Sequence, residues 1–121
     1  MNQRESGKIA EKIAQTHLRS KGYQIIAVNW QYHHLEIDII ARQGDELVIV
    51  EVKSREGFGF EHPLDAITQQ KMQHVINAAE SFIQLSGWDK DTRFDLITIV
   101  FNGSNGQYEL EHYEDAFNSE A

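Results

Sequence analysis

Two short stretches of this sequence place charged side chains inside runs that otherwise have the composition of buried β-strands. The first stretch, Leu-Glu-Ile-Asp-Ile-Ile, carries Glu36 and Asp38, and the second, Val-Glu-Val-Lys-Ser, carries Glu51 and Lys53. A buried charge without a partner is costly, so clusters of this kind commonly bind a metal ion or take part in catalysis. These four residues are where the sequence suggests chemistry.

The spacing of these residues predicts which of them face one another. A Gly-Asp turn signal at residues 44–45 suits a two-residue β-hairpin between the two stretches. Counting outward from this turn in antiparallel register sets Asp38 opposite Glu51 and Glu36 opposite Lys53. Directly opposed residues have Cβ atoms roughly 4.5–5.5 Å apart, close enough for two carboxylates to share one cation. The pattern therefore predicts an acidic pair with an ammonium group beside it.

A divalent cation is the simplest way to keep both acids ionised, because two bare carboxylates at that distance repel and one tends to protonate. The same residues also fit a structural interpretation. On an exposed face of the sheet, Asp38 and Glu51 would form a salt-bridge network with Lys53 and Arg55.

The bulk properties indicate one domain spanning residues 1–121, with no cysteine and hence no disulfide or thiolate site. Without a signal-like or membrane-spanning apolar run, we expect a cytoplasmic protein that does not enter a membrane. The net charge of −8 speaks against a strongly basic nucleic-acid-binding protein. All 11 Lys and Arg residues, however, precede residue 101, while acids crowd a strand and tail from about residue 107.

Hydrophobic periodicity predicts the element order αβββαββ, an α/β fold with a mixed sheet flanked by helices. The elements are expected at a helix over 4–20, a strand over 23–30, a loop over 31–34, the hairpin, a helix from Pro63 to about 86, and strands over 93–101 and 107–113. The strand over 93–101 is apolar on both faces, which is typical of a central strand of the sheet.

Several charged residues fall beside or within the apolar stripes of the two helices. Glu11 lies at the border of the buried arc of the first helix, and a basic strip, Arg4, Lys8, Lys12 and Arg19, covers the adjoining face. This strip is either a phosphate-binding surface or an ordinary solvated helix face. Lys71 lies in the stripe of the second helix and extends to the substrate, to the acidic pair or into a structural ion pair. The six histidines show no zinc-ligand spacing, and we interpret them as surface or boundary residues.

The split Asp38 and Glu51-Val52-Lys53 pattern resembles the signature of restriction-endonuclease-like nucleases. With its wider context the chain resembles the bacterial YraN-type family of uncharacterised proteins, which is similar to archaeal Holliday junction resolvases. That context comprises the Gly7, Glu11, Ala14 and Leu18 spacing, Gly22-Tyr23, Asn29-Trp30, the Glu36-to-Ala41 and Val50-to-Arg55 segments, Phe58-Gly59, Lys71 and Arg93-Phe94-Asp95. The match covers residues 4 to about 101. One departure is Leu35, where the family usually has Gly.

The resemblance implies a restriction-endonuclease-like core with a metal site built from Asp38 and Glu51, Lys53 beside it, and Glu11 as the resolvase-like helix glutamate. We therefore expect a Mg²⁺- or Mn²⁺-dependent endonuclease acting on DNA, branched or structured DNA included. A backbone carbonyl near Val52, alone or together with Glu11, would help these acids to hold the cation.

The remaining charged residues have supporting parts in this hypothesis. Lys53 would orient the attacking water or stabilise the phosphorane, and Glu36 would pair with Lys53 or face solvent. The basic strip, Arg55 and Lys71 would contact the nucleic acid. By analogy with resolvases, a symmetric homodimer is expected.

Two other classes of function fit the same sequence. One is a non-catalytic nucleic-acid-binding or partner-recruiting module on a nuclease fold, which the low positive charge favours. The other is a protein-interaction domain whose acidic C-terminal segment is the contact surface.

Overall fold

A five-stranded mixed β-sheet forms the middle layer of the protein, in a computed structural model that describes residues 2–103 and 105–118. The strands lie side by side in their sequence order, and only β3 and β4 are parallel. The elements are α1 (Gln3–Ser20), β1 (Gln24–Tyr32), β2 (Leu35–Gln43), β3 (Glu46–Glu56), the 3₁₀-helix η1 (Pro63–Ala66), α2 (Gln69–Ser86), β4 (Thr92–Asn102) and β5 (Gln107–Phe117).

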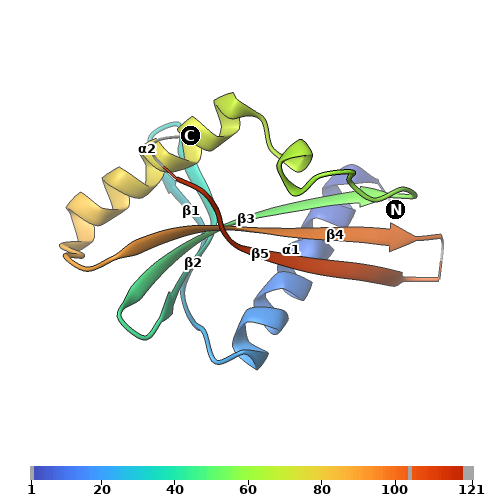
Figure 1. Ribbon diagram of the computed structural model, residues 1–121, viewed down its shortest axis with the longest axis horizontal. Coiled ribbons are helices and arrows are strands. Elements are labelled where there is room, and N and C mark those ends of the chain that lie inside the picture. The colour runs from blue at the N-terminus through green and yellow to red at the C-terminus, as the bar shows by residue number, and fades with distance from the viewer. Residues whose placement is uncertain (1, 104, 119–121) are drawn as a thin grey trace.

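Each face of the sheet is covered by one helix, so the core has two halves (Figure 1). Leu18 and other small or apolar residues of α1 pack against Val48, Val50 and Ile97 on one face. On the other face, α2 packs against Leu47, Ile49 and Leu96. Alternation along β3 therefore sends odd-numbered side chains toward α2 and even-numbered ones toward α1.

The predicted order αβββαββ and the α/β class are confirmed. The strand expected at the centre of the sheet, residues 93–101, is an interior strand, because β4 lies between β3 and β5, but the central strand is β3. The two-residue turn at Gly44-Asp45 pairs Gln43 with Glu46 as predicted, and Gly44 has the positive φ of 60° that the turn requires.

Three predicted boundaries are wrong. Pro63 opens η1 instead of the long helix, and α2 begins only at Gln69, where the Thr68 hydroxyl caps it by accepting from the Lys71 N–H at 3.0 Å. The strand β1 runs to Tyr32, into the segment expected to be a loop, and β5 runs on to Phe117. Both strands continue because each has an antiparallel neighbour to pair with.

The sheet opens between β2 and β3. Their pairing stops at Ile39–Val50, although both strands continue, and beyond this point β2 pairs only with β1 and β3 only with β4. In Figure 1, β1 and β2 turn away where β3 runs on beside β4. A register shift in β1 between Ile25 and Ala27 and the left-handed Asn29 (φ 51°) add twist to this outer pair of strands. We call this opening the fork.

Among the described residues, no helix is long and apolar enough to cross a membrane. The acidic C-terminal segment forms most of the edge strand β5, whereas Glu120 lies outside the described residues.

Candidate active site

Asp38 lies at the fork, one residue past the last β2–β3 pair. Its Oδ2 atom accepts a hydrogen bond of 2.9 Å from the main-chain N–H of Val52. With the ladder ended, this N–H has no carbonyl of β2 to bond, and the carboxylate takes that role. The fork thus fixes the Asp38 side chain against β3.

Glu51 faces the same opening from β3 and is only 3 % exposed. Burial, the charge of Asp38 and a hydrogen bond with Asp38 together raise the pKa of its carboxyl to about 8, although Lys71 and Lys53 lower it. The two carboxyl groups therefore lie close together, as the hairpin register predicted, in a place where the ionised form of Glu51 is unfavourable.

Two ammonium groups partly compensate this acidic pair. The Lys71 Nζ atom, from the first turn of α2, lies 3.7 Å from Glu51 Oε1, so the lysine in the apolar stripe does extend to the acidic pair. Lys53 is half-buried on β3 and lies near enough to lower the pKa of Glu51. Neither cation outweighs burial and the neighbouring carboxylate.

Glu11 approaches the site from α1. Its Oε2 atom accepts a hydrogen bond of 3.0 Å from the Asn29 side-chain amide, which the left-handed backbone of Asn29 places beside the fork. Burial raises the pKa of Glu11, the Asn29 bond lowers it, and the charges of Asp38 and Glu36 raise it. Glu11 thus feels the charge of the site without joining the acidic pair.

Other predicted neighbours are not brought together. Glu36 pairs with Gln31 of β1, not with Lys53, because β2 has already left β3 at this point.

The basic strip of Arg4, Lys8, Lys12 and Arg19 is exposed on α1. The 3.6-residue periodicity of the sequence places Ile9 in the apolar arc of that helix, and this prediction is wrong, because Ile9 is 42 % exposed.

The side-chain atoms at the fork that could bind a metal ion are carboxylate oxygens, and oxygen ligands suit Mg²⁺ and Mn²⁺ better than softer metals. Within residues 2–103 and 105–118, no group of three or more His, Asp or Glu side chains is placed to hold a metal ion. A cation here would therefore rest on Asp38, Glu51 and a main-chain oxygen. The Val52 carbonyl fits this role, because the N–H and C=O of one strand residue point to the same edge, and the Val52 N–H points to Asp38.

A polar pocket of about 520 Å³ lies beside the fork, along the edge of β3 that β2 has left. It is lined by residues of β3 from Val52 to Glu56, including Lys53 and Arg55, and by the first turn and a half of α1, including Gly7. Val52 and Lys53 are the residues of the site that line this pocket, and Asp38 and Glu51 are not among its lining residues.

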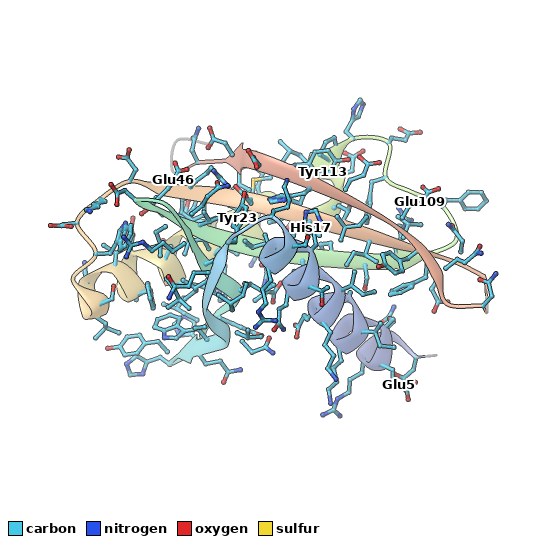
Figure 2. The ribbon with its side chains drawn as sticks, turned by 90° about the horizontal axis from the view of Figure 1, so that it is seen from below. Glu5, His17, Tyr23, Glu46, Glu109 and Tyr113 are labelled. Carbon is cyan, nitrogen blue, oxygen red and sulfur yellow. The ribbon has the colours of Figure 1, made fainter. Side chains whose placement is uncertain are left out.

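A second buried cluster, on the α1 face of the sheet, was not predicted from the sequence. Asp95 is fully buried on β4, where its carboxylate accepts bonds of 2.8 and 2.9 Å from the Arg93 guanidinium and one of 3.0 Å from the Asp115 N–H. His112 Nε2 lies 2.7 Å from Asp95 Oδ2, and His112 Nδ1 lies 3.1 Å from His17 Nε2. Figure 2 shows His17 and Tyr23 close together where α1 meets the sheet.

The prediction that all histidines are surface or boundary residues is wrong for His112, whose side chain is 4 % exposed. Because a carboxylate only accepts, His112 Nε2–H donates to Asp95. The available signal was an aspartate inside the apolar run of β4, which demands a buried partner.

Comparison with known proteins places this geometry in a family. Residues 10–99 match the sequence profile of a family described as "Uncharacterised protein family UPF0102". The chain belongs to UPF0102. The resemblance to YraN-type proteins is thereby confirmed, and the matched segment contains Glu11, Asp38, Glu51 and Lys53.

Individual UPF0102 proteins align over nearly the whole chain. A UPF0102 protein of Bacteroides fragilis is 40 % identical over 111 residues, which is 92 % of this chain and 90 % of the relative. One of Nitratidesulfovibrio vulgaris is 41 % identical over 113 residues, 93 % of this chain and 83 % of the relative. One of Chlorobium chlorochromatii is 38 % identical over 117 residues, 93 % and 91 % of the two chains.

Proposed function

We propose that this UPF0102 protein is a Mg²⁺- or Mn²⁺-dependent endonuclease that hydrolyses phosphodiester bonds in DNA, in the bacterial cytoplasm. The observation that carries the proposal is the convergence of Asp38 and Glu51 at the fork, with Lys53 and Lys71 beside them. A purely structural salt-bridge network is less favourable, because Glu51 is buried and has a raised pKa despite both lysines.

The side chains at the fork divide the expected work. Asp38, Glu51 and the Val52 carbonyl would hold the cation, which would act as a Lewis acid on a phosphate oxygen and lower the pKa of the attacking water. Lys53 would position that water and stabilise the negative charge that develops on the phosphorane. Lys71, one third exposed, would turn from Glu51 toward the substrate phosphate once the acid has another cationic partner.

Glu11 and the exposed basic residues would position the substrate. Glu11 holds Asn29, and through it the outer strands, at the mouth of the site. Arg4, Lys8, Lys12, Arg19 and Arg55 would contact the sugar–phosphate backbone without reading sequence. A two-fold symmetric dimer would present two such sites to a four-way junction.

The net charge of −8 favours a second candidate function, a non-catalytic module that binds nucleic acid weakly or recruits a protein partner. Such a module would keep the fold of the sheet without needing a cation at the fork. The two candidates differ in what loss of Asp38 does.

Cleavage assays test the proposal directly. The purified protein is incubated with Mg²⁺ or Mn²⁺ and single-stranded, flap, four-way and duplex DNA, in parallel with Asp38→Asn, Glu51→Gln and Lys53→Met. We expect each variant to lose about 100-fold or more of the activity, because each removes a contact worth several kcal/mol in the transition state. Asp89→Asn, an exposed acid on the loop after α2, is the matched control and should cleave normally.

Cleavage that persists in both Glu51→Gln and Lys53→Met would come from a contaminant and would overturn the assignment. Absence of cleavage by the wild-type protein on every substrate, together with DNA binding that survives Asp38→Asn, would favour the non-catalytic module.

A further inference from the structure

The free edge of β3 forms a path away from the acidic pair. From Glu51 to Glu56 this strand pairs with β4 alone, because β2 has left it at the fork. The Val52 N–H points to the free edge, so by alternation those of Ser54 and Glu56 do too. This edge offers main-chain hydrogen-bond donors to an anionic chain, and two cationic side chains, Lys53 and Arg55, line the same pocket together with the acid Glu56.

Beyond this edge lies the most exposed large apolar side chain of the described residues. Phe58 is 87 % exposed, in a loop between Gly57 and Gly59 directly after β3. In Figure 1 this loop and the N-terminal end of α1 lie at the same end of the molecule. Phe60, two residues further on, has the Arg55 guanidinium 4.8 Å above its ring and is already occupied. Phe58 therefore presents an uncovered aromatic face beyond the end of the free edge of β3.

The spacing suits a nucleic-acid strand. Glu56 lies five residues after Glu51 on β3, about 17 Å away at the usual rise of a strand. This length corresponds to about five stacked nucleotides. In an intact duplex, the faces of the bases are covered by their neighbours, whereas unpaired bases stack readily on aromatic side chains. A ring at this position thus selects for unpaired nucleotides beside the scissile phosphate.

We propose that a DNA strand with unpaired bases follows the free edge of β3 from the acidic pair and stacks one base on Phe58. This inference rests on the proposed function, since it names the substrate form of the same site. It makes Phe58 a specificity-determining residue that favours single-stranded or branched DNA over continuous duplex. It does not require Phe58 to touch the reacting atoms.

Binding measured without divalent metal tests the proposal separately from cleavage. Fluorescence anisotropy in EDTA compares a single-stranded oligonucleotide with the blunt duplex of the same sequence, for wild type, Phe58→Ala, Phe58→Leu and Phe58→Trp. We expect Phe58→Ala to weaken single-strand binding about 10-fold or more and duplex binding less than about 2-fold. Phe58→Trp should retain the affinity, and Phe58→Leu, which is apolar but lacks a π-face, should not.

Leu85→Ala is the matched control, because Leu85 is also an exposed apolar residue (61 % exposed) but lies near the C-terminal end of α2. It should bind as wild type does. A 2-aminopurine base in the single strand should be quenched by wild type and not by Phe58→Ala.

The proposal is overturned if the wild-type protein does not bind the single strand, or if Phe58→Ala leaves that affinity unchanged. It is equally overturned if Phe58→Leu binds as wild type does, or if Phe58→Ala alters only self-association, since Phe58 would then serve a protein contact. Phe58-dependent binding without any cleavage would support the stacking and contradict the nuclease assignment.

Discussion

Glu51 on β3 and Asp95 on β4 are two buried carboxylates on neighbouring strands, and their surroundings have opposite effects. Glu51 faces α2 beside a second acid, and its pKa is raised to about 8. Asp95 faces α1. Burial alone would raise its pKa, but hydrogen bonds from His112, Arg93 and the Asp115 N–H outweigh burial and lower it.

The difference separates a structural acid from one that awaits a ligand. Every oxygen of Asp95 is matched by donors from Arg93, His112 and the main chain of β5, so the cluster ties β4 to its neighbours. Glu51 has one lysine at 3.7 Å and a carboxylate for a neighbour. A buried acid that its surroundings leave undercompensated is a candidate for function, whereas a fully matched acid is a candidate for stability.

The largest expected effect on stability is that of Asp95→Ala. The change leaves Arg93, whose side chain is 11 % exposed, without its main partner, and also deprives His112 of its acceptor. Breaking a buried ion pair on one side costs about 3–5 kcal/mol. Urea unfolding followed by circular dichroism at neutral pH should show this loss. A loss of less than about 1 kcal/mol in the free energy of unfolding would show that Asp95 is not an important stabilising residue.

Glu51→Gln should act in the opposite direction. At about pH 9 in EDTA, Glu51 of the wild-type protein is ionised although it is buried, and burying this charge destabilises the folded state. The Gln side chain has nearly the same size as Glu but carries no charge. We expect the variant to be more stable than wild type by about 1 kcal/mol or more in the same unfolding experiment. If it is destabilised as strongly as Asp95→Ala, Glu51 is a structural acid.

The pH dependence of stability should divide between the two carboxylates. Because the folded pKa of Glu51 is raised from 4.5 to about 8, its contribution is fully present below pH 4.5 and is lost as pH rises through about 8. The folded pKa of Asp95 is lowered from 3.8, so its contribution is present above pH 3.8 and is lost as pH falls below that value.

Free energies of unfolding measured across pH in EDTA check this division. Glu51→Gln should flatten the alkaline side only, and Asp95→Asn the acid side only. A single variant that flattens both sides would show that the two sites are not independent.

The smallest expected effect is that of Lys71→Gln. Lys71 lowers the pKa of Glu51, so its removal should raise that pKa and shift the alkaline loss of stability to higher pH. The cost in stability should stay below about 1 kcal/mol, because Lys71 is one third exposed and its ion pair with Glu51 is long, at 3.7 Å. The acid side should be unchanged. The same pH series provides the measurement, and an unchanged alkaline side would contradict the ion pair.

The acidic pair was predictable from sequence because it depends on local rules. A Gly44-Asp45 turn fixes the register of a hairpin, and the register sets Asp38 opposite Glu51. The predicted pairing of Glu36 with Lys53 is wrong for a physical reason that counting residues outward from the turn does not take into account. The twist added by Asn29 and by the register shift in β1 ends the ladder before Glu36 is reached.

The Asp95 cluster was missed because its partners are far apart in the sequence. His17 and His112 lie 95 residues apart in the sequence and meet only when α1 packs on the sheet. No periodicity or turn signal encodes such a contact. The apolar strand around Asp95 indicated only that some partner was needed.

Calorimetric titration of the metal-free protein with MnCl₂ or MgCl₂ at neutral pH shows whether Asp38 and Glu51 together bind a cation. We expect one saturable site in the wild-type protein and in Asp89→Asn, and loss of that site in both Asp38→Asn and Glu51→Gln. Binding of equal strength in both variants, or no binding by the wild-type protein, would contradict a cation held at the fork.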